Sequence, residues 1–302
     1  MPANVYDHPD VAALVRLCLD EDLRHAGDLT CRSLVPTGSV LHGEIIAKQA
    51  GTVCGLELFC VVYAMLADGT PAQGVLVEGL AADGATVTAG SVVGRIRGAA
   101  ATVLSGERTA LNLCQRLSGV ATAARRYVEA VAGTRAKVYD TRKTTPGLRL
   151  LEKHAVASGG CANHRMGLYD AVLIKNNHIA LMEGLAGVRC ASAEAVRRCR
   201  AQVGAAVVIQ VEISALDELE PVIAAGADLV LLDNMVPEQI RTAVEIRNRI
   251  SARVGLEASG GITLANVRDY ALTGVDRIST GAITHSVSAL DLALHCAAPT
   301  TR

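Results

Sequence analysis

The chain has 302 residues, half of them hydrophobic, and its 29 basic side chains nearly balance its 30 acidic ones. That length suits two domains or one large barrel with an appended domain, and the aliphatic composition excludes a disordered chain. The net charge of −1 provides no global field that would attract nucleic acid or anionic lipid. The nine cysteines include no Cys-x-x-Cys pair, so we interpret them as small hydrophobic residues in a reducing compartment.

The sequence does not open with a basic segment followed by an apolar stretch, so no secretory signal is expected. The longest apolar runs, such as 58–67, are shorter than the roughly 20 residues that a membrane span requires. These two observations predict a cytoplasmic protein.

The first hundred residues predict a small mixed domain. Residues 10–20 have the apolar spacing of a helix, and a second helical run covers 56–67. Short β-rich runs surround the second helix and indicate an antiparallel sheet. These runs are 44–48, 52–55, 75–79 and 91–97. A long helix without Pro is predicted at 100–132.

From Ala136 onward a strand, loop and helix pattern repeats. The strand candidates are continuous apolar runs, as expected when helices cover the outer face of a parallel sheet. They are 136–140, 170–175, 207–212, 228–232, 254–258 and 276–280, and the helical stretches include 192–202, 216–225, 237–251 and 263–272. The pattern is typical of an α/β barrel. An open doubly wound sheet is the alternative, although the sequence has neither a Gly-x-Gly-x-x-Gly nor a Walker loop.

Charged and small polar residues stand where these strands end. In chain order the strand ends carry Asp140 with Arg142 and Lys143, then Lys175, Glu212, Asp233-Asn234, Ser259-Gly260-Gly261 and Ser279-Thr280-Gly281. In an α/β barrel these ends share the rim on which an active site is built.

The cations of this region predict an anion site. Five basic side chains lie within one segment of a chain that is nearly neutral overall. They are Arg142, Lys143, His164, Arg165 and Lys175. Each uncompensated buried charge costs several kcal/mol, so we expect a small, multiply charged anion among them. The two glycine turns suit a phosphate, because free N–H groups at the start of a helix can face it.

The residues alone leave three assignments open. Lys175 could form a Schiff base, as in aldolases, could bind an anion, or could extend to solvent as a structural lysine. Glu212 and Asp233 could hold Mg²⁺, contact sugar hydroxyls or steady a developing cation, but they could also cap helices or pair with arginines. A non-enzymatic module that binds anions or nucleic acid is disfavoured by the balanced charge and by an aromatic content of 2%.

Several long motifs, in the same order, resemble those of the quinolinate phosphoribosyltransferase family, also called nicotinate-nucleotide pyrophosphorylase (carboxylating). The resemblance extends over essentially the whole chain. The motifs are Glu21-Asp22-Leu23, Gly27-Asp28-Leu29-Thr30, 106–112, 115–119, 140–147, Asn163-His164-Arg165 with 166–168, 259–262 and Ser279-Thr280-Gly281.

The resemblance implies a fold, an assembly and a reaction. The fold is an N-terminal α+β sandwich domain over 1–114, joined by a C-terminal helix at 286–302, and an incomplete α/β barrel over 115–285. The assembly is a homodimer in which the partner completes each active site. The reaction converts quinolinate and phosphoribosyl pyrophosphate, with Mg²⁺, to nicotinate mononucleotide, pyrophosphate and CO₂.

The resemblance also implies roles for individual residues. A pocket for the quinolinate carboxylates would be formed by Arg142, His164, Arg165 and Lys175, with Arg108 reaching in from the other subunit. Lys143 would contact the pyrophosphate region, and the ribose with its Mg²⁺ would face Glu212 and Asp233. The 5′-phosphate cradle would comprise Ser259, Gly260, Gly261 and Gly281. The expected catalytic residues are Lys143, Lys175, Glu212 and Asp233.

The chain departs from the family pattern at two positions. Asn176 and Gln210 stand where the family often has acidic residues, which would change the charge around Lys175 and Glu212. The alternative is a related pyrophosphorylase-like protein associated with molybdenum transport, which shares the fold. The intact Asn163-His164-Arg165 and the run from Ile174 to His178 favour the quinolinate family.

Overall fold

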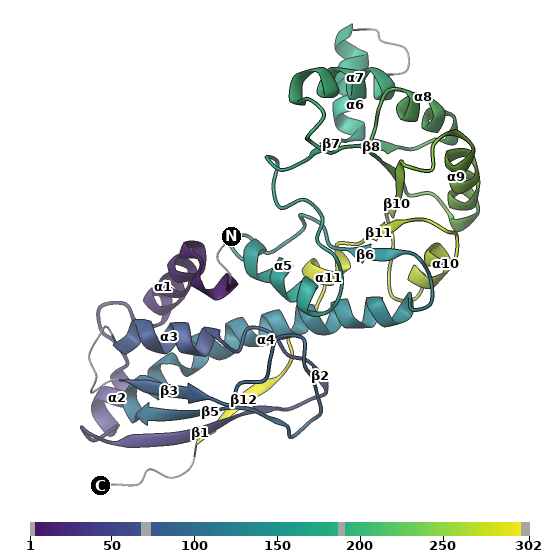
Figure 1. Cartoon of the computed structure of the whole chain (residues 1–302). Helices are drawn as coiled ribbons and strands as arrows, with labels where there is room; N and C mark the ends of the chain where they lie inside the picture. Colours follow the sequence, from purple (N-terminus) through teal and green to yellow (C-terminus); the bar gives the residue numbers. More distant parts are fainter. Residues whose placement is uncertain (1–3, 68–73, 187–190, 297–302) are drawn as a thin grey trace. The chain divides into compact units, whose positions relative to one another are not determined.

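A computed structural model describes residues 4–67, 74–186 and 191–296 (Figure 1). The chain forms two compact units. The first comprises Met1–Arg125, Thr145–Gly160 and Val287–Arg302, and the second comprises Arg126–Thr144 and Cys161–Ser286. This division differs from the expected boundary at residue 114, because helix α4 (Ala100–Ala130) continues through that position without a Pro to end it.

The first unit is built on an antiparallel four-stranded sheet with the order β12-β1-β5-β3. Alternate residues of β1 are buried, which places one face of the sheet on a core and leaves the other face more open. The strands are β1 (Val40–Ala47), β3 (Val75–Glu78), β5 (Val92–Ala99) and β12 (Leu292–Cys296), with a separate pair β2 (Gly51–Thr52) and β4 (Thr86–Val87). Its helices are η1 (Val5–Asp7), α1 (Pro9–Leu23), α2 (Leu29–Leu34), α3 (Leu58–Ala67), α5 (Arg149–Ser158) and most of α4.

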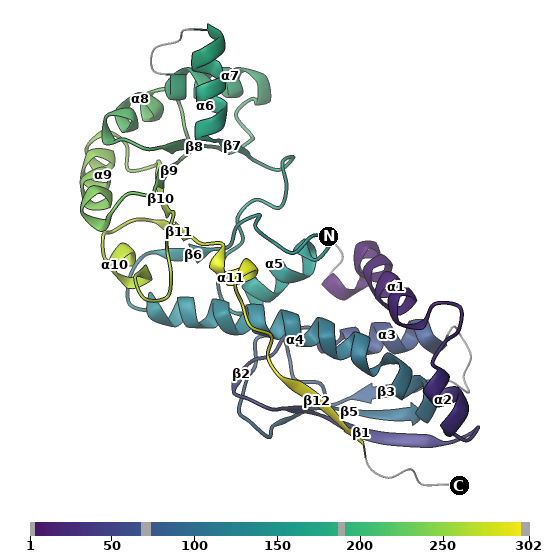
Figure 2. The same ribbon diagram turned by 180° about the vertical axis from the view of Figure 1, so that it is seen from behind.

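The helix predicted at 286–302 is wrong for the residues that the structure describes there. Leu292–Cys296 forms strand β12, which pairs with β1 from Gly43 opposite Cys296 to Ala47 opposite Leu292. Figure 2 shows β12 (yellow) along β1, and residues 297–302 lie outside the described residues. The Ala- and Leu-rich sequence favours a helix locally, but pairing along the edge of β1 prevails.

The second unit contains a six-stranded parallel sheet with the order β6-β11-β10-β9-β8-β7. The strands β6 and β7 lie at the two ends of that order, and no pairing between them is present in the described residues, so the barrel is incomplete. The strands are β6 (Lys137–Tyr139), β7 (Val172–Ile174), β8 (Ile209–Ile213), β9 (Leu229–Asp233), β10 (Gly255–Ser259) and β11 (Arg277–Ser279). This confirms the predicted α/β class and refutes the doubly wound alternative.

Helices cover the outer side of this curved sheet (Figures 1 and 2). The helices of this unit are α6 (Asn176–Ala186), α7 (Ala191–Val203), η3 (Leu216–Glu218), α8 (Leu219–Ala224), α9 (Pro237–Ile250), α10 (Val267–Ala271) and α11 (Ala282–His285). The strand register sets Ser259 opposite both Asp233 and Ser279, so three strand ends are level at the carboxyl edge. None of the described helices has both the length and the apolarity needed to cross a bilayer.

Candidate active site

A cavity of about 600 Å³ opens at the carboxyl edge of the parallel sheet. Its walls bring together most of the residues that the sequence singled out. They are Thr141, Arg142, Lys143, His164, Arg165, Leu173, Lys175, Glu212, Leu231, Asp233, Asn234, Glu257, Ser259, Gly260, Gly261 and Ser279. Cations and carboxylates therefore share one space although they are separated by up to about 120 residues of sequence.

Asp140 joins the two cationic loops. Its side chain is fully buried directly after β6, and its Oδ1 accepts a hydrogen bond of 2.6 Å from the backbone N–H of His164. Ala162 extends the edge of β6, because its N–H donates to Val138 O over 2.8 Å and its carbonyl accepts from the Asp140 N–H over 3.1 Å. The loop that carries His164 is thereby fixed beside the loop that carries Arg142.

The loop after His164 is closed by Asp170. Its carboxylate accepts hydrogen bonds from the backbone N–H groups of Met166 at 2.6 Å and Gly167 at 3.0 Å. Partial burial opposes ionisation, but these N–H groups outweigh it and lower the pKa of Asp170. The guanidinium of Arg165 donates to the carbonyl of Ala171 over 2.9 Å, which holds its side chain across the same loop.

Arg142 and Arg165 bring like charges together in the cavity wall. Burial, and then the positive charge of Arg142, lower the pKa of Arg165. The Nε atoms of both guanidinium groups are buried, and neither hydrogen bonds to an atom in the described part of the chain. Two buried donors that repel each other are suited to a ligand that brings negative charge and acceptors.

His164 has a defined tautomer. Its Nδ1 accepts a hydrogen bond of 2.8 Å from the backbone N–H of Arg165, so the ring proton belongs on Nε2. That nitrogen lies 3.0 Å from Gln210 Oε1 and 3.5 Å from Glu257 Oε1. Burial of Glu257 opposes its ionisation, but its interaction with His164 outweighs burial and lowers the pKa of Glu257.

Glu257 is a site residue that the sequence reasoning missed. It is fully buried in the middle of β10, where its neighbours are Leu256 and Ala258. A carboxylate between two apolar residues of a parallel strand is the signal that could have identified it, because buried charges require partners. Gln210, one of the two departures from the family pattern, lies beside it at His164.

Glu212 and Asp233 form a carboxylate pair at the ends of β8 and β9. Burial and the negative charge of Asp233 raise the pKa of Glu212, while Lys175 opposes this rise. The side-chain amide of Asn176 donates to Glu212 Oε1 at 3.0 Å, to Ser214 Oγ at 3.1 Å and to Asp233 Oδ2 at 3.4 Å. Asn176, the second departure, is thus a direct partner of both carboxylates.

Two positions in the turn after β10 favour glycine. Gly260 has φ +100°, and a Cβ there would lie 2.2 Å from Asn234 Oδ1. Gly261 has φ +61° with no atom within 4 Å of a Cβ, so that backbone borders open space. Both conformations are unfavourable for residues with a Cβ. Asn234 itself has φ +55°, and its N–H donates to Ser259 O over 2.9 Å.

The turn after β11 lies beside the turn after β10. Thr280 Oγ1 donates to the carbonyl of Ile262 over 2.9 Å. Gly281 is not in the cavity wall, but a Cβ on it would lie 2.8 Å from Lys143 Cδ, so it accommodates the lysine. Thr284 Oγ1 donates to Lys143 O over 2.8 Å.

Arg108 is located in the first unit, on α4. Its side chain is 62% exposed, and its NH2 lies 3.8 Å from Glu107 Oε1. It is not one of the residues in the wall of the second unit's cavity.

Comparison with known proteins gives matches over nearly the whole chain. Residues 28–118 match the model of the N-terminal domain of quinolinate phosphoribosyl transferase, and residues 120–295 match that of its C-terminal domain.

Similar curated proteins include nicotinate-nucleotide pyrophosphorylases [carboxylating] from two bacteria. The chain is 39% identical over 284 residues to nicotinate-nucleotide pyrophosphorylase [carboxylating] of Mycobacterium leprae, covering 93% of this chain and 95% of the relative. It is 42% identical over 268 residues to the probable enzyme of that name from Bacillus subtilis, covering 89% and 87%.

Solved structures agree in fold. NadC from Streptococcus pyogenes superposes with a TM-score of 0.85 at 34% identity, covering 96% of each chain. The nicotinate-nucleotide pyrophosphorylase from Francisella tularensis gives a TM-score of 0.83 at 35% identity, covering 97% of this chain and 99% of that one.

Proposed function

The chain belongs to the quinolinate phosphoribosyltransferase family, and on that premise we propose how it performs the family's reaction. It transfers the phosphoribosyl group of phosphoribosyl pyrophosphate to quinolinate and releases pyrophosphate and CO₂, which yields nicotinate mononucleotide for NAD biosynthesis. The molybdenum-associated alternative is not favoured, because the similar curated proteins are carboxylating nicotinate-nucleotide pyrophosphorylases.

The arginine pair is the observation that carries the proposal. Quinolinate is a pyridine with two adjacent carboxylates, so it offers two negative charges in one plane. The buried Nε atoms of Arg142 and Arg165 lack partners in the described residues, and burial, followed by the charge of Arg142, depresses the pKa of Arg165. A planar dianion supplies what both groups need, and guanidinium groups bind carboxylates in a fixed geometry.

We assign the rest of the dicarboxylate pocket to His164 and Lys175. The Nε2–H of His164 is held by Gln210 and Glu257, which fixes the ring. Lys175 is exposed at the start of α6 and lines the same cavity, so its ammonium is free to meet a carboxylate. An ammonium that clamps an anion needs no Schiff base.

The carboxylate pair is assigned to the ribose. Pyrophosphate departs from the sugar carbon as the pyridine nitrogen arrives, so positive charge develops on the sugar in the transition state. Glu212 and Asp233 lie at the cavity wall and can stabilise that charge. The nitrogen needs only to be positioned, which the cationic clamp on the two carboxylates supplies.

Loss of CO₂ follows from the product of that transfer. Once ribosylated, the ring nitrogen is cationic. The bond between the ring and the adjacent carboxylate then breaks, its electron pair stays on the ring carbon, and that carbon takes a proton. The cation beside the carbanion stabilises it, so the chain needs no covalent nucleophile, and the cysteines have no part in this step.

We assign the 5′-phosphate to the two glycine turns and the pyrophosphate to Lys143. Gly260 and Gly261 both have positive φ angles, and the backbone at Gly261 borders open space, where N–H groups can face an anion. Ser259 is in the same turn, and Gly281 leaves room for the Lys143 side chain against the second turn. Lys143 is exposed and is free to reach a departing pyrophosphate.

The carboxylate pair also suits Mg²⁺. Mg²⁺ prefers carboxylate oxygens and keeps several waters, which a partly open pair allows. Burial and then the negative charge of Asp233 raise the pKa of Glu212, and a bound cation would offset both effects. Glu212 and Asp233 would hold the ion, and the ion would supply positive charge toward the leaving pyrophosphate.

The assembly and location are further parts of this proposal. The exposed side chain of Arg108 on α4 is available to enter the cavity of a partner subunit in a homodimer. A cytoplasmic location stays a prediction, which cell fractionation tests.

The test of the proposed function is product analysis. Purified protein is incubated with quinolinate, phosphoribosyl pyrophosphate and Mg²⁺, and nicotinate mononucleotide is measured by chromatography. The proposal expects product only with both substrates, and expects none when nicotinate replaces quinolinate. Equal turnover of nicotinate would contradict the dianion assignment.

A further inference from the structure

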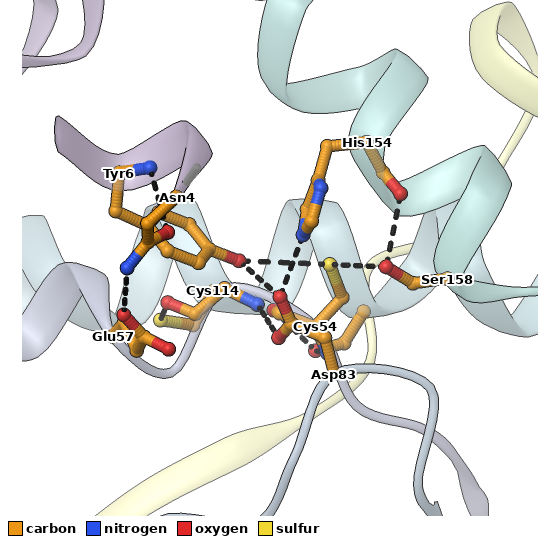
Figure 3. Close-up of polar contacts among 10 residues, drawn as sticks. Asn4, Tyr6, Cys54, Glu57, Asp83, Cys114, His154 and Ser158 are labelled. Atoms are coloured by element: carbon orange, nitrogen blue, oxygen red, sulfur yellow. Dashed lines mark hydrogen bonds and ion pairs between the residues drawn. The ribbon is translucent and has the colours of Figure 1, made fainter. Parts of the chain in front are cut away.

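A second cluster of ligand-type side chains lies within the first unit (Figure 3). Cys54 follows β2, Asp83 precedes β4, and His154 lies on α5. The Sγ of Cys54, a carboxylate oxygen of Asp83 and a ring nitrogen of His154 all lie within 4.8 Å of one another. Three different metal-ligand types thus converge from three separate segments.

We propose that Cys54, Asp83 and His154 bind one Zn²⁺ ion. Ordinary zinc–ligand bonds at tetrahedral angles put neighbouring ligand atoms roughly 3.3–3.6 Å apart. His154 Nε2 and Asp83 Oδ2 are 2.7 Å apart, so they must separate slightly to admit the ion. The distance between each pair of ligand atoms therefore needs to change by little more than about 1 Å, which small rotations of the side chains can provide.

The surrounding groups orient the ligands. Asp83 Oδ1 accepts a hydrogen bond of 2.8 Å from the Gly55 N–H, which leaves Oδ2 facing the cluster. Ser158 Oγ donates to the backbone carbonyl of His154 over 2.9 Å and lies 3.7 Å from Cys54 Sγ. Such outer hydrogen bonds fix ligand geometry in zinc sites.

The hydroxyl group of Tyr6 lies beside the three proposed ligands. This hydroxyl donates to Asp83 Oδ2 over 2.5 Å and lies 3.9 Å from Cys54 Sγ. The Tyr6 oxygen or one water completes four ligands around the ion. An ion enters from the side of His154 and Asp83, whose side chains are 31% and 22% exposed.

The thiol selects the metal. Cys54 is fully buried, and its Sγ is the sulfur ligand that the cluster offers. Binding forms a metal–sulfur bond and releases the thiol proton to water, which requires a metal with high affinity for thiolate. Zn²⁺ meets that requirement, whereas Mg²⁺ and Ca²⁺ favour oxygen ligands.

The experiment uses untagged, full-length protein stripped with a chelator. Zn²⁺ is added, excess is removed by gel filtration, and zinc per chain is measured by mass spectrometry. The proposal expects about one ion per chain and a rise in melting temperature. Co²⁺ added in place of Zn²⁺ should give the sulfur-to-cobalt charge-transfer band of a thiolate ligand. Wild-type protein that retains no zinc and shows no such band overturns the proposal and leaves a purely hydrogen-bonded cluster.

Variants assign the ligand and separate this site from the barrel carboxylates. Cys54→Ser should lose the charge-transfer band and the zinc-dependent rise in melting temperature. Cys60→Ser removes an exposed thiol from the same unit and should keep both. Circular dichroism checks that each variant is folded. A band that survives in Cys54→Ser, or disappears equally in Cys60→Ser, overturns the assignment.

Discussion

Asn176 donates a side-chain hydrogen bond to Glu212, with 3.0 Å between its Nδ2 and the Oε1 of the carboxylate. The same amide nitrogen lies 3.4 Å from Asp233 Oδ2, so one neutral donor serves both members of the carboxylate pair. An acidic residue at this position would instead add a third negative charge. Asn176 therefore places a neutral donor, rather than a third negative charge, between the two carboxylates.

Asn176→Asp should move the acid limb of kcat/KM to higher pH. Burial and Asp233 already raise the pKa of Glu212, so activity that needs its carboxylate falls before the ordinary Glu range is reached. A further negative charge raises that pKa further. Asn177→Asp adds the same charge at the exposed neighbouring position and should shift the limb less. A limb that stays in place or moves to lower pH in Asn176→Asp contradicts this account.

Arg142→Ala should weaken quinolinate binding by roughly 30- to 150-fold, because it removes a charged hydrogen bond worth about 2–3 kcal/mol. Calorimetric titration with quinolinate measures the loss, and titration with phosphoribosyl pyrophosphate should change by less than about twofold. Arg253→Ala, at an exposed position outside the cavity wall, is the control and should bind quinolinate as the wild type does. Full quinolinate affinity in Arg142→Ala would show that Arg142 does not bind the quinolinate carboxylates.

Glu257→Gln should destabilise the fold at neutral pH by about 1–3 kcal/mol, because it weakens the buried partner of His164. The folded-state pKa of Glu257 is depressed. Its contribution is therefore present above the unfolded pKa of about 4.3 and is lost as pH falls through the lower folded pKa. Urea unfolding of wild type and variant should converge as pH is lowered below about 4. Glu245→Gln, at an exposed site, should match the wild type throughout. A difference in unfolding free energy between the wild type and Glu257→Gln that grows as pH falls would contradict this prediction.

Gly261→Ala should raise the KM for phosphoribosyl pyrophosphate by at least about tenfold, since the left-handed turn would no longer present its N–H groups. Backbone strain alone costs about 1–2 kcal/mol of stability. Gly204→Ala is matched for strain, with φ +74° against +61°, and also has no atom within 4 Å of its Cβ. It follows α7, outside the cavity wall, and should lose stability but keep the KM. Equal KM values in the two variants would argue against a phosphate at Gly261.

Mixing Arg108→Ala subunits with Lys175→Ala subunits should restore part of the activity that each variant lacks alone. In a homodimer with shared sites, the mixed dimer holds one site with both residues intact, so up to about a quarter of wild-type activity is expected at random mixing. Native mass spectrometry verifies that mixed dimers form. Mixed dimers without any recovered activity would place Arg108 outside the partner's site.

The parallel strands could be predicted because their sequences are continuous apolar runs, and the strand ends then followed from barrel topology. Arg142, Lys175, Glu212 and Asp233 line one cavity for that reason. Strand β12 could not be predicted, because its Ala- and Leu-rich sequence is helical by propensity and only pairing with β1 makes it a strand.

Two other features needed three-dimensional contacts. Glu257 is recognised as part of the site only through its contact with His164. The two residues are far apart in sequence, but His164 Nε2 lies 3.5 Å from Glu257 Oε1. The cluster of Cys54, Asp83 and His154 is assembled from three segments with no recognisable ligand spacing, so no motif in the sequence marks it. Both were missed because the sequence pattern reports elements and their ends, whereas side-chain pairs depend on packing.

The most direct test of the central claim is release of CO₂ from quinolinate labelled in the carboxylate next to the ring nitrogen. We predict release only when phosphoribosyl pyrophosphate and Mg²⁺ are both present, in an amount equal to the nicotinate mononucleotide formed. Release without phosphoribosyl pyrophosphate, or no release under any condition by folded protein, would contradict the claim that this chain couples phosphoribosyl transfer to decarboxylation.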